Sequence, residues 1–250
     1  MMNPAEFENI DRVERDFWWF QGMNRILFHL LERELAGRAP RQLLETGCGT
    51  GGFATLLRQR WPSASVHVSD LAMEGLQFAR ERGLASRTQA DIRALPYADA
   101  SFGTVLSLDV IVHLKRGEEA RALSELARVL RPGGLAVIRC SALDILHSRH
   151  SDFTHERQRF TRARLMRGAA EAGLIPKRCT YLNSFLMPVA LAKFRLWEPL
   201  FGAKPASGLV QPPAWLNRML SCGLTSELAL LRRGIDLPLG QTVLLLARKR

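Results

Sequence analysis

Cysteines are few and scattered in this chain of 250 residues. The four of them, Cys48, Cys140, Cys179 and Cys222, form no C-x-x-C pair. This spacing argues against a zinc knuckle and against a disulfide framework, the usual staple of small secreted domains. We therefore expect no metal site and a reducing, cytoplasmic environment.

A secretory leader and a membrane-spanning run are also missing. The first twenty residues, MMNPAEFENIDRVERDFWWF, carry several acids and no apolar signal core. The longest apolar candidate, residues 184–202, is interrupted by two prolines and three charges. Such interruptions are incompatible with a transmembrane helix. We expect a cytoplasmic protein with no transmembrane segment.

Lysine is scarce although the chain is basic. Only five of the 35 basic residues are lysine, and the formal net charge is +11. Dispersed arginine is more typical of solvated helix faces than of a nucleic-acid-binding stripe, so we expect no nucleic-acid partner. The densest basic run, residues 147–167, is the exception. It could form a positive rim over an anionic or lipid-like acceptor.

Strand-like and helix-like segments alternate from about residue 41, which predicts a Rossmann-like, doubly wound α/β fold with a seven-stranded sheet. In such sheets the ligand crevice lies at the carboxyl ends of the strands. Strands are expected at 42–46, 65–69, 87–90, 104–108, 135–140, 176–183 and 242–247, and helices at 52–60, 72–82, 117–130 and 161–172.

We expect a single domain over residues 1–250, since 47% hydrophobic residues suffice for one well-buried core. One or two amphipathic helices over residues 7–35, with the aromatic cluster Phe17, Trp18, Trp19 and Phe20, would make residues 1–40 an N-terminal helical lid. The other expected parts are a cofactor-binding core at 41–183, a helical insertion at 184–240, and the last strand and tail at 241–250.

The most informative segment is LLETGCGTGG, residues 43–52, where an apolar run passes through an acid into a glycine cluster. Such a turn lets the backbone lie against a ligand and offer its N–H groups. Gly47, Gly49 and Gly52 also satisfy the dinucleotide-binding pattern. Asp70 follows about 20 residues later, where a carboxylate can accept both hydroxyls of a ribose. Asp70 could equally cap the next helix.

Four motifs make the assignment more specific: ETGCGTG, VSD, ADIRALPYADASFGTVLSLDVIVHL and ELARVLRPGGLAVI. Over residues 41–141 they resemble the class I S-adenosylmethionine-dependent methyltransferases, in particular the small-molecule group called type 11. The L-P-Y-x-D-x-S-F pattern and the R-P-G-G turn are not features of dinucleotide dehydrogenases. Thr46 and Gly103 depart from the usual family pattern, although neither is expected to touch the cofactor.

The resemblance implies S-adenosyl-L-methionine as cofactor and assigns a role to each part of the site. Glu45 would orient the methionine end, Asp70 would hold the ribose, and Asp91 with Ile92 would bracket the adenine. The glycines of the turn would pass along the cofactor, and Leu108 and Asp109 would face the methionine and the methyl group. The expected cofactor-binding residues are Glu45, Gly47, Cys48, Gly49, Gly51, Asp70, Leu71, Asp91, Ile92, Leu108 and Asp109.

Three histidines are candidates for a general base, a role that suits a neutral imidazole at pH 7. His113 is the first choice, because it lies just after the fourth strand on the expected cofactor side. A backbone carbonyl could equally satisfy it. His155 is second, because HERQRF is similar to a segment that follows the fifth strand in some relatives. His150 is the third. The histidines at 147, 150 and 155 match no tight zinc spacing.

The predicted function is methyl transfer to a small, apolar or lipid-like metabolite, most readily at oxygen or carbon. The aromatic N-terminus and the apolar insertion would shape the acceptor pocket. These inserted segments could instead form a homodimer interface or touch a membrane surface. The rival functions are an RNA or protein methyltransferase and a non-catalytic cofactor-binding partner. The insertion residues expected to contribute are Phe185, Leu186, Met187, Phe194, Trp197, Leu200, Phe201 and Trp215.

Overall fold

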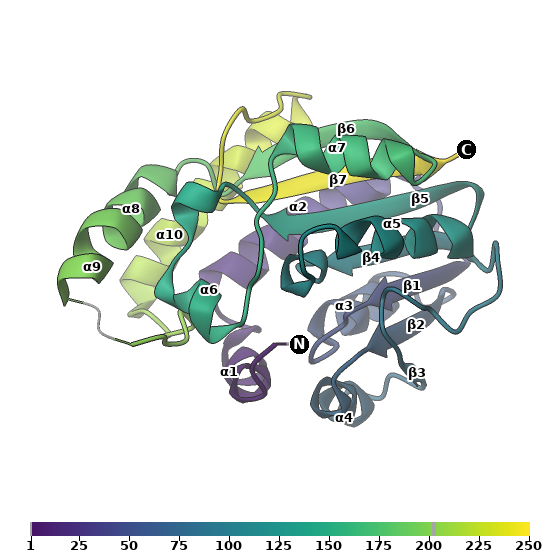
Figure 1. Ribbon diagram of the computed structural model, residues 1–250, viewed down its shortest axis with the longest axis horizontal. Helices are drawn as coiled ribbons and strands as arrows, with labels where there is room; N and C mark the ends of the chain where they lie inside the picture. Colours follow the sequence, from purple (N-terminus) through teal and green to yellow (C-terminus); the bar gives the residue numbers. More distant parts are fainter. Residues whose placement is uncertain (1, 202–203) are drawn as a thin grey trace.

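A seven-stranded sheet forms the centre of the protein, with helices on both faces (Figure 1). The computed structural model describes residues 2–201 and 204–250. The strands, in chain order, are β1 (Gln42–Thr46), β2 (Ser65–Asp70), β3 (Ser86–Gln89), β4 (Phe102–Leu108), β5 (Leu130–Ser141), β6 (Leu174–Leu182) and β7 (Thr242–Lys249). Their spatial order is β3-β2-β1-β4-β5-β7-β6.

Strand direction follows the doubly wound pattern. The strands β3, β2, β1, β4 and β5 pair in parallel, and β7 lies antiparallel between β5 and β6. The order reverses at β1, which pairs with β2 on one side and β4 on the other. Ligands bind in the crevice outside the carboxyl ends of the strands at such a reversal. The predicted fold class is therefore confirmed.

The helices are distributed over both faces of the sheet and over one end of the molecule (Figure 1). In chain order they are α1 (Ala5–Val13), α2 (Trp18–Glu34), α3 (Gly52–Arg60), α4 (Met73–Glu81), η1 (Ile111–His113), α5 (Glu118–Val129), η2 (Asp144–Leu146), α6 (Arg149–Phe153), α7 (Arg162–Glu171), α8 (Met187–Ala192), the π-helical turn η3 (Lys193–Trp197), α9 (Glu198–Phe201) and α10 (Ala214–Arg232).

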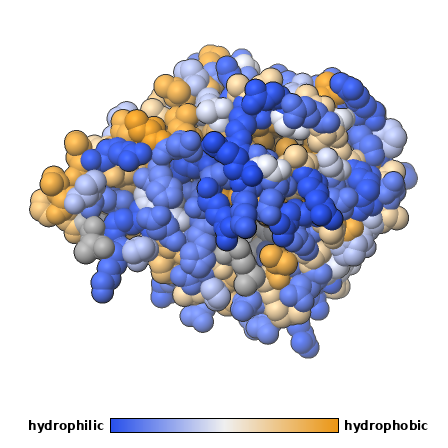
Figure 2. Space-filling view, viewed as in Figure 1, coloured by the Kyte–Doolittle hydropathy of each residue, from blue (hydrophilic) through white to orange (hydrophobic). Residues whose placement is uncertain are grey.

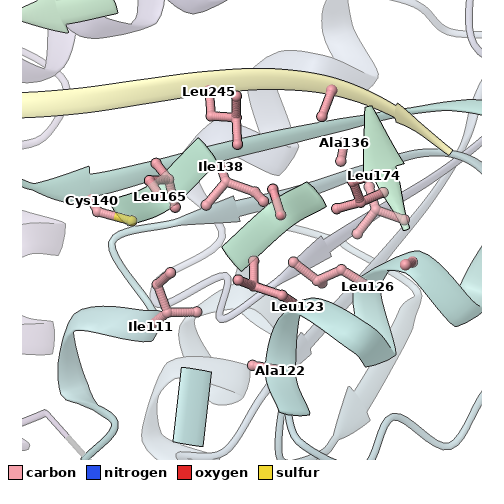
Figure 3. Close-up of a cluster of buried hydrophobic side chains, with 14 of the residues drawn as sticks. Ile111, Ala122, Leu123, Leu126, Ala136, Ile138, Cys140, Leu165, Leu174 and Leu245 are labelled. Atoms are coloured by element: carbon pink, nitrogen blue, oxygen red, sulfur yellow. The ribbon is translucent and has the colours of Figure 1, made fainter. Parts of the chain in front are cut away.

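Side chains that alternate along the strands contribute to two large apolar cores, one on each face of the sheet. On one face, α5 and α7 pack Leu123, Leu126 and Leu165 against Ile138 of β5 (Figure 3). On the other face, α2 and α10 pack against the opposite side chains of the same strands. In β7, Leu245 belongs to the first core, whereas Leu244 and Leu246 belong to the second. A central strand buried on both faces is expected to be almost continuously apolar, as β7 is.

The start of one strand differs from the sequence-based expectation by more than two residues, and the segment after that strand contains a helix that was not predicted. The strand β5 begins at Leu130, five residues before the predicted start, because Leu130 already pairs with Phe102 of β4. The R-P-G-G segment thus lies within an irregular part of the strand. The short helix α6 was not predicted, and it begins at a capping box formed by Ser148 and Ser151. Within residues 2–201 and 204–250, no helix has the length and apolarity needed to cross a membrane.

Candidate active site

One large cavity, of about 1600 Å³, lies along the carboxyl ends of β1, β2 and β4. Helices α1, α2 and α8 and the segment after β5 complete its walls. The lining includes ten of the eleven predicted cofactor-binding residues and the predicted base His113. The ten are Glu45, Gly47, Cys48, Gly49, Asp70, Leu71, Asp91, Ile92, Leu108 and Asp109.

The glycine turn after β1 requires glycine at two positions for different reasons. Gly47 has a φ of +68°, and a Cβ there would lie 2.2 Å from Cγ2 of Val110. Gly49 has a φ of +55°, but no atom lies within 4 Å of the Cβ it lacks. Gly47 therefore serves close packing, whereas Gly49 presents bare backbone to open space, as a bound ligand requires.

Asp70, at the end of β2, fastens this turn. Its Oδ2 accepts a hydrogen bond from the Gly49 N–H at 2.8 Å, and its Oδ1 accepts one from the Ala72 N–H at 2.8 Å. Burial raises the pKa of this carboxyl, and the two backbone hydrogen bonds oppose the rise. Asp70 thus organises both the turn and the entry to α4. A ribose would bind the lone pairs that the two N–H groups leave free.

Glu45 is the most unusual carboxyl of the site. Glu45 is only 3% exposed, and its Oε2 has no hydrogen-bond partner among the described residues. Desolvation raises the pKa of Glu45 to about 8, although the nearby Arg139 guanidinium lowers it. A buried polar atom without a partner costs free energy that a bound donor would recover.

Five other predicted cofactor residues lie in different settings. Ile92 and Cys48 are buried in the wall, whereas Leu71 is 44% exposed. The carboxylate of Asp91 already accepts hydrogen bonds from Arg93, at 2.6 Å from Nη2 to Oδ2, and these bonds lower its pKa. An adenine amine would have to share that carboxylate. Gly51 is absent from the cavity wall, because it packs beneath the turn, where a Cβ would lie 2.7 Å from Leu84.

These features fit S-adenosylmethionine. Glu45 offers an unpartnered acceptor, Gly49 offers an open backbone face, and Asp70 offers carboxylate lone pairs at the spacing typical of a ribose site. When bound, this cofactor supplies an activated methyl group. The role of each residue toward it stays a prediction.

The sequence analysis missed Arg139, which lies in β5 and is 7% exposed. Its Nη2 lies 2.7 Å from Oδ2 of Asp109, and its guanidinium lies over the Trp19 ring at 4.9 Å from the centroid. A charged residue inside the apolar strand LAVIRC was the signal that could have found it. Trp19 belongs to the aromatic N-terminus that was expected to shape the acceptor pocket, and it lines the cavity together with Trp18 and Phe20.

The three candidate histidines separate in the structure. His113 lines the cavity, with Nδ1 3.3 Å from the backbone carbonyl oxygen of His155. Burial lowers its pKa, which favours a neutral ring at pH 7. His155 has an exposed side chain that is absent from the cavity wall, a placement that does not favour the predicted catalytic role. His150 does line the cavity, and its Nδ1 accepts a hydrogen bond from the Gly208 N–H at 2.9 Å.

The expected contribution of the insertion is only partly correct. Leu186 and Phe194 line the cavity. Four other residues on which that expectation rested point to solvent instead. Trp197 is 61% exposed, Leu200 74%, Phe201 68% and Trp215 69%. A helical segment presents its side chains in several directions, so apolar composition alone could not tell which side chains face the cavity.

Comparisons with known proteins agree with this geometry. Residues 44–138 match the family model described as a methyltransferase domain. Malonyl-acyl-carrier-protein O-methyltransferase from Halorhodospira halophila is 35% identical over 164 residues, covering 58% of this chain and 54% of that protein. Demethylmenaquinone methyltransferase from Thermus thermophilus is 39% identical over 106 residues, covering 40% of this chain and 47% of that protein. The chain thus spans about half the length of these curated relatives.

A solved SAM-dependent methyltransferase from Thermotoga maritima has the same fold over nearly the whole chain. The TM-score is 0.60 at 18% identity, and the alignment covers 98% of this chain and 96% of that one. Together with the glycine turn and its two carboxylates, these matches show a methyltransferase domain over residues 44–138, in a chain that has the fold of a solved S-adenosylmethionine-dependent methyltransferase.

Proposed function

We propose that this protein transfers the methyl group of S-adenosylmethionine to a small, lipid-like acceptor, at oxygen or carbon. One observation carries the proposal: the predicted cofactor residues and an apolar, aromatic wall line the same cavity. Its volume of about 1600 Å³ exceeds the roughly 300–1,000 Å³ of an ordinary ligand pocket. The cavity therefore has room for two ligands side by side.

The cofactor half supplies binding and orientation. The carboxylate of Asp70, fixed by the Gly49 N–H, and the buried carboxyl of Glu45 would hold the ribose and the methionine end of the cofactor. Methyl transfer needs little other machinery, because holding the acceptor atom in line with the methyl group is worth up to about 7–11 kcal/mol. Placement of both ligands by rigid strand ends is the main contribution of the protein.

The acceptor half combines apolar surface with cations. Trp18, Phe20, Leu186 and Phe194 line it, and so does Arg139. The apolar side chains suit a hydrocarbon body, and the guanidinium suits an oxygen at its head. The two curated relatives are named as methyltransferases of malonyl-acyl-carrier protein and of demethylmenaquinone, which supports a lipid-like acceptor.

His113 is the proposed general base when the acceptor is a hydroxyl. Its Nδ1–H would donate to the His155 carbonyl, which leaves Nε2 as the proton acceptor. The segments at 1–40 and 184–240 are proposed to act as lid and cap, because α1, α2 and α8 all contribute to the cavity wall. A cytoplasmic location and the lack of a nucleic-acid partner stay predictions of the sequence.

The test uses methyl-labelled S-adenosylmethionine with three acceptors: a long-chain fatty acid, a prenylated quinol and transfer RNA. We expect label in the organic phase with a lipid acceptor, and none on the RNA. Label on transfer RNA alone would favour the RNA methyltransferase alternative. If titration with S-adenosylhomocysteine gives neither heat nor a thermal shift, the whole assignment fails.

A further inference from the structure

An exposed apolar patch covers the end of the molecule formed by α8, η3, α9 and the first turns of α10. Nine of the fifteen exposed large apolar side chains in the described residues lie between 185 and 219. Figure 2 shows hydrophobic groups at this end, at the left of the view, with hydrophilic groups between them. We define the insertion patch by these nine: Phe185, Val189, Leu196, Trp197, Leu200, Phe201, Val210, Trp215 and Met219.

The segment 187–201 is apolar on two opposite sides. Its inner side, with Ala190 and Phe194, lines the cavity. Its outer side carries Leu196, Trp197 and Leu200, which are 61–74% exposed and do not line the cavity. A helix that is apolar all round is normally buried on every side. An exposed patch of this extent marks an interaction surface.

The charges of the patch are predominantly positive. Lys193, Arg195, Lys204 and Arg218 are exposed around it. Glu198 is the only acid between Phe185 and Cys222, and its Oε2 accepts a hydrogen bond from the Arg149 N–H at 3.0 Å. The surface thus combines exposed tryptophans with an excess of cations, the composition of a segment that lies in the headgroup region of an anionic membrane.

A second copy of this chain fits the patch less well. In a two-fold dimer the same patch lies on both sides of the interface, so the lysines and arginines of both copies would face each other. Such like-charge juxtaposition is unfavourable, whereas an anionic lipid surface complements the cations.

The outer side also carries a hollow of about 540 Å³, lined by Ala192, Lys193, Leu196, Trp197, Leu200 and Phe201. An acyl chain could occupy this hollow.

We propose that the insertion patch docks the protein on an anionic lipid bilayer, with Trp197 and Leu200 entering the interface and Lys193, Arg195 and Lys204 contacting the headgroups. Because the inner side of the same helical segment lines the cavity, docking would bring the cavity next to the bilayer. The inference concerns a surface and not the reaction, so its test needs no methyl transfer.

The test is sedimentation of the full chain with vesicles of phosphatidylcholine alone or mixed with phosphatidylglycerol. We expect binding to the anionic vesicles, weaker binding at high salt, and a loss on the order of ten-fold in the double variant Trp197→Ser, Leu200→Ser. The matched control is Ile235→Ser, Leu239→Ser, which removes two side chains that are 49% and 51% exposed beyond the other end of α10. The control should bind as the parent does.

Three results would overturn the proposal. The first is absence of binding to the anionic vesicles, and the second is unchanged binding by the double variant at Trp197 and Leu200. The third is that the parent protein binds no vesicles and forms a dimer in analytical ultracentrifugation, whereas the double variant is a monomer. Retained affinity for S-adenosylhomocysteine verifies that both double variants are folded. Affinity of the parent for S-adenosylhomocysteine tests the proposed function independently, so a failure of vesicle docking can be distinguished from a failure of the proposed function.

Discussion

The guanidinium of Arg139 in β5 donates two hydrogen bonds to one carboxylate oxygen of Asp109, which directly follows the neighbouring strand β4. Nη2 lies 2.7 Å and Nε 2.9 Å from Oδ2 of Asp109. Asp109 has a φ of +60°, a conformation that costs a non-glycine residue free energy unless its surroundings hold it. Trp19 of α2 covers the guanidinium from the other side. The ion pair of Arg139 and Asp109 thus connects helix α2 to the site.

Arg139→Met should lower the free energy of unfolding by about 1–3 kcal/mol, because the half-buried Asp109 carboxylate loses its charged donor. Urea unfolding measures this change. Adding Asp109→Asn should recover part of the loss, because the unpaired charge is then removed as well. If Arg139→Met is as stable as the parent, the ion pair does not hold the segment in place.

Glu45 should make the stability of the ligand-free protein depend on pH. Its folded pKa is about 8, above its ordinary value of 4.5. The stabilisation from the protonated form is therefore full below pH 4.5 and is lost progressively as the pH rises to about 8. Glu45→Gln removes this dependence, so the melting temperature of the variant should exceed that of the parent near pH 8.

Melting curves recorded at several pH values between about 5 and 9 test the Glu45 prediction. The difference between variant and parent should grow as the pH rises. Parallel pH dependences would exclude a raised pKa at this position. The same variant should bind S-adenosylhomocysteine more weakly, since an amide replaces the carboxyl that would meet the methionine end.

Two substitutions of Asp70 should separate its structural role from its binding role. Asp70→Ala removes the acceptors of Gly49 N–H and Ala72 N–H, which should cost about 1–3 kcal/mol of stability. Asp70→Asn keeps one acceptor oxygen and should destabilise less. Both should weaken S-adenosylhomocysteine binding, by roughly 10- to 100-fold in calorimetry. Unchanged affinity in Asp70→Asn would refute the ribose assignment.

His113→Asn should lower turnover by about 10²- to 10⁴-fold for a hydroxyl acceptor, while cofactor affinity stays unchanged. An asparagine amide can still donate to the His155 carbonyl, so the local structure is preserved better than in His113→Ala. Because burial lowers the pKa of His113, the acidic limb of the parent's pH–rate profile should lie below pH 6.5. Equal turnover in parent and variant would make His113 a structural residue.

Local sequence patterns predicted the sheet well and selected residues that line one cavity at its strand ends, because both depend on short-range features. The glycine cluster of residues 47–52 indicates a turn from the local sequence alone, and Asp70 follows at the end of the next strand. Parallel strands then bring these carboxyl ends together. The outer half of the site was predicted less well. Arg139 and His150 come from separate segments that line the same cavity only after folding.

The sequence by itself determined the alternation of strands and helices, the glycine turn and its carboxylates, because periodicity and backbone conformation are local properties. Only the tertiary structure decided that β7 lies between β5 and β6, that Gly51 packs beneath the turn, and that Trp197 and Leu200 face solvent while Phe194 faces the cavity. Apolar residues are interchangeable in composition. The packing of the whole chain alone determines which of them are covered.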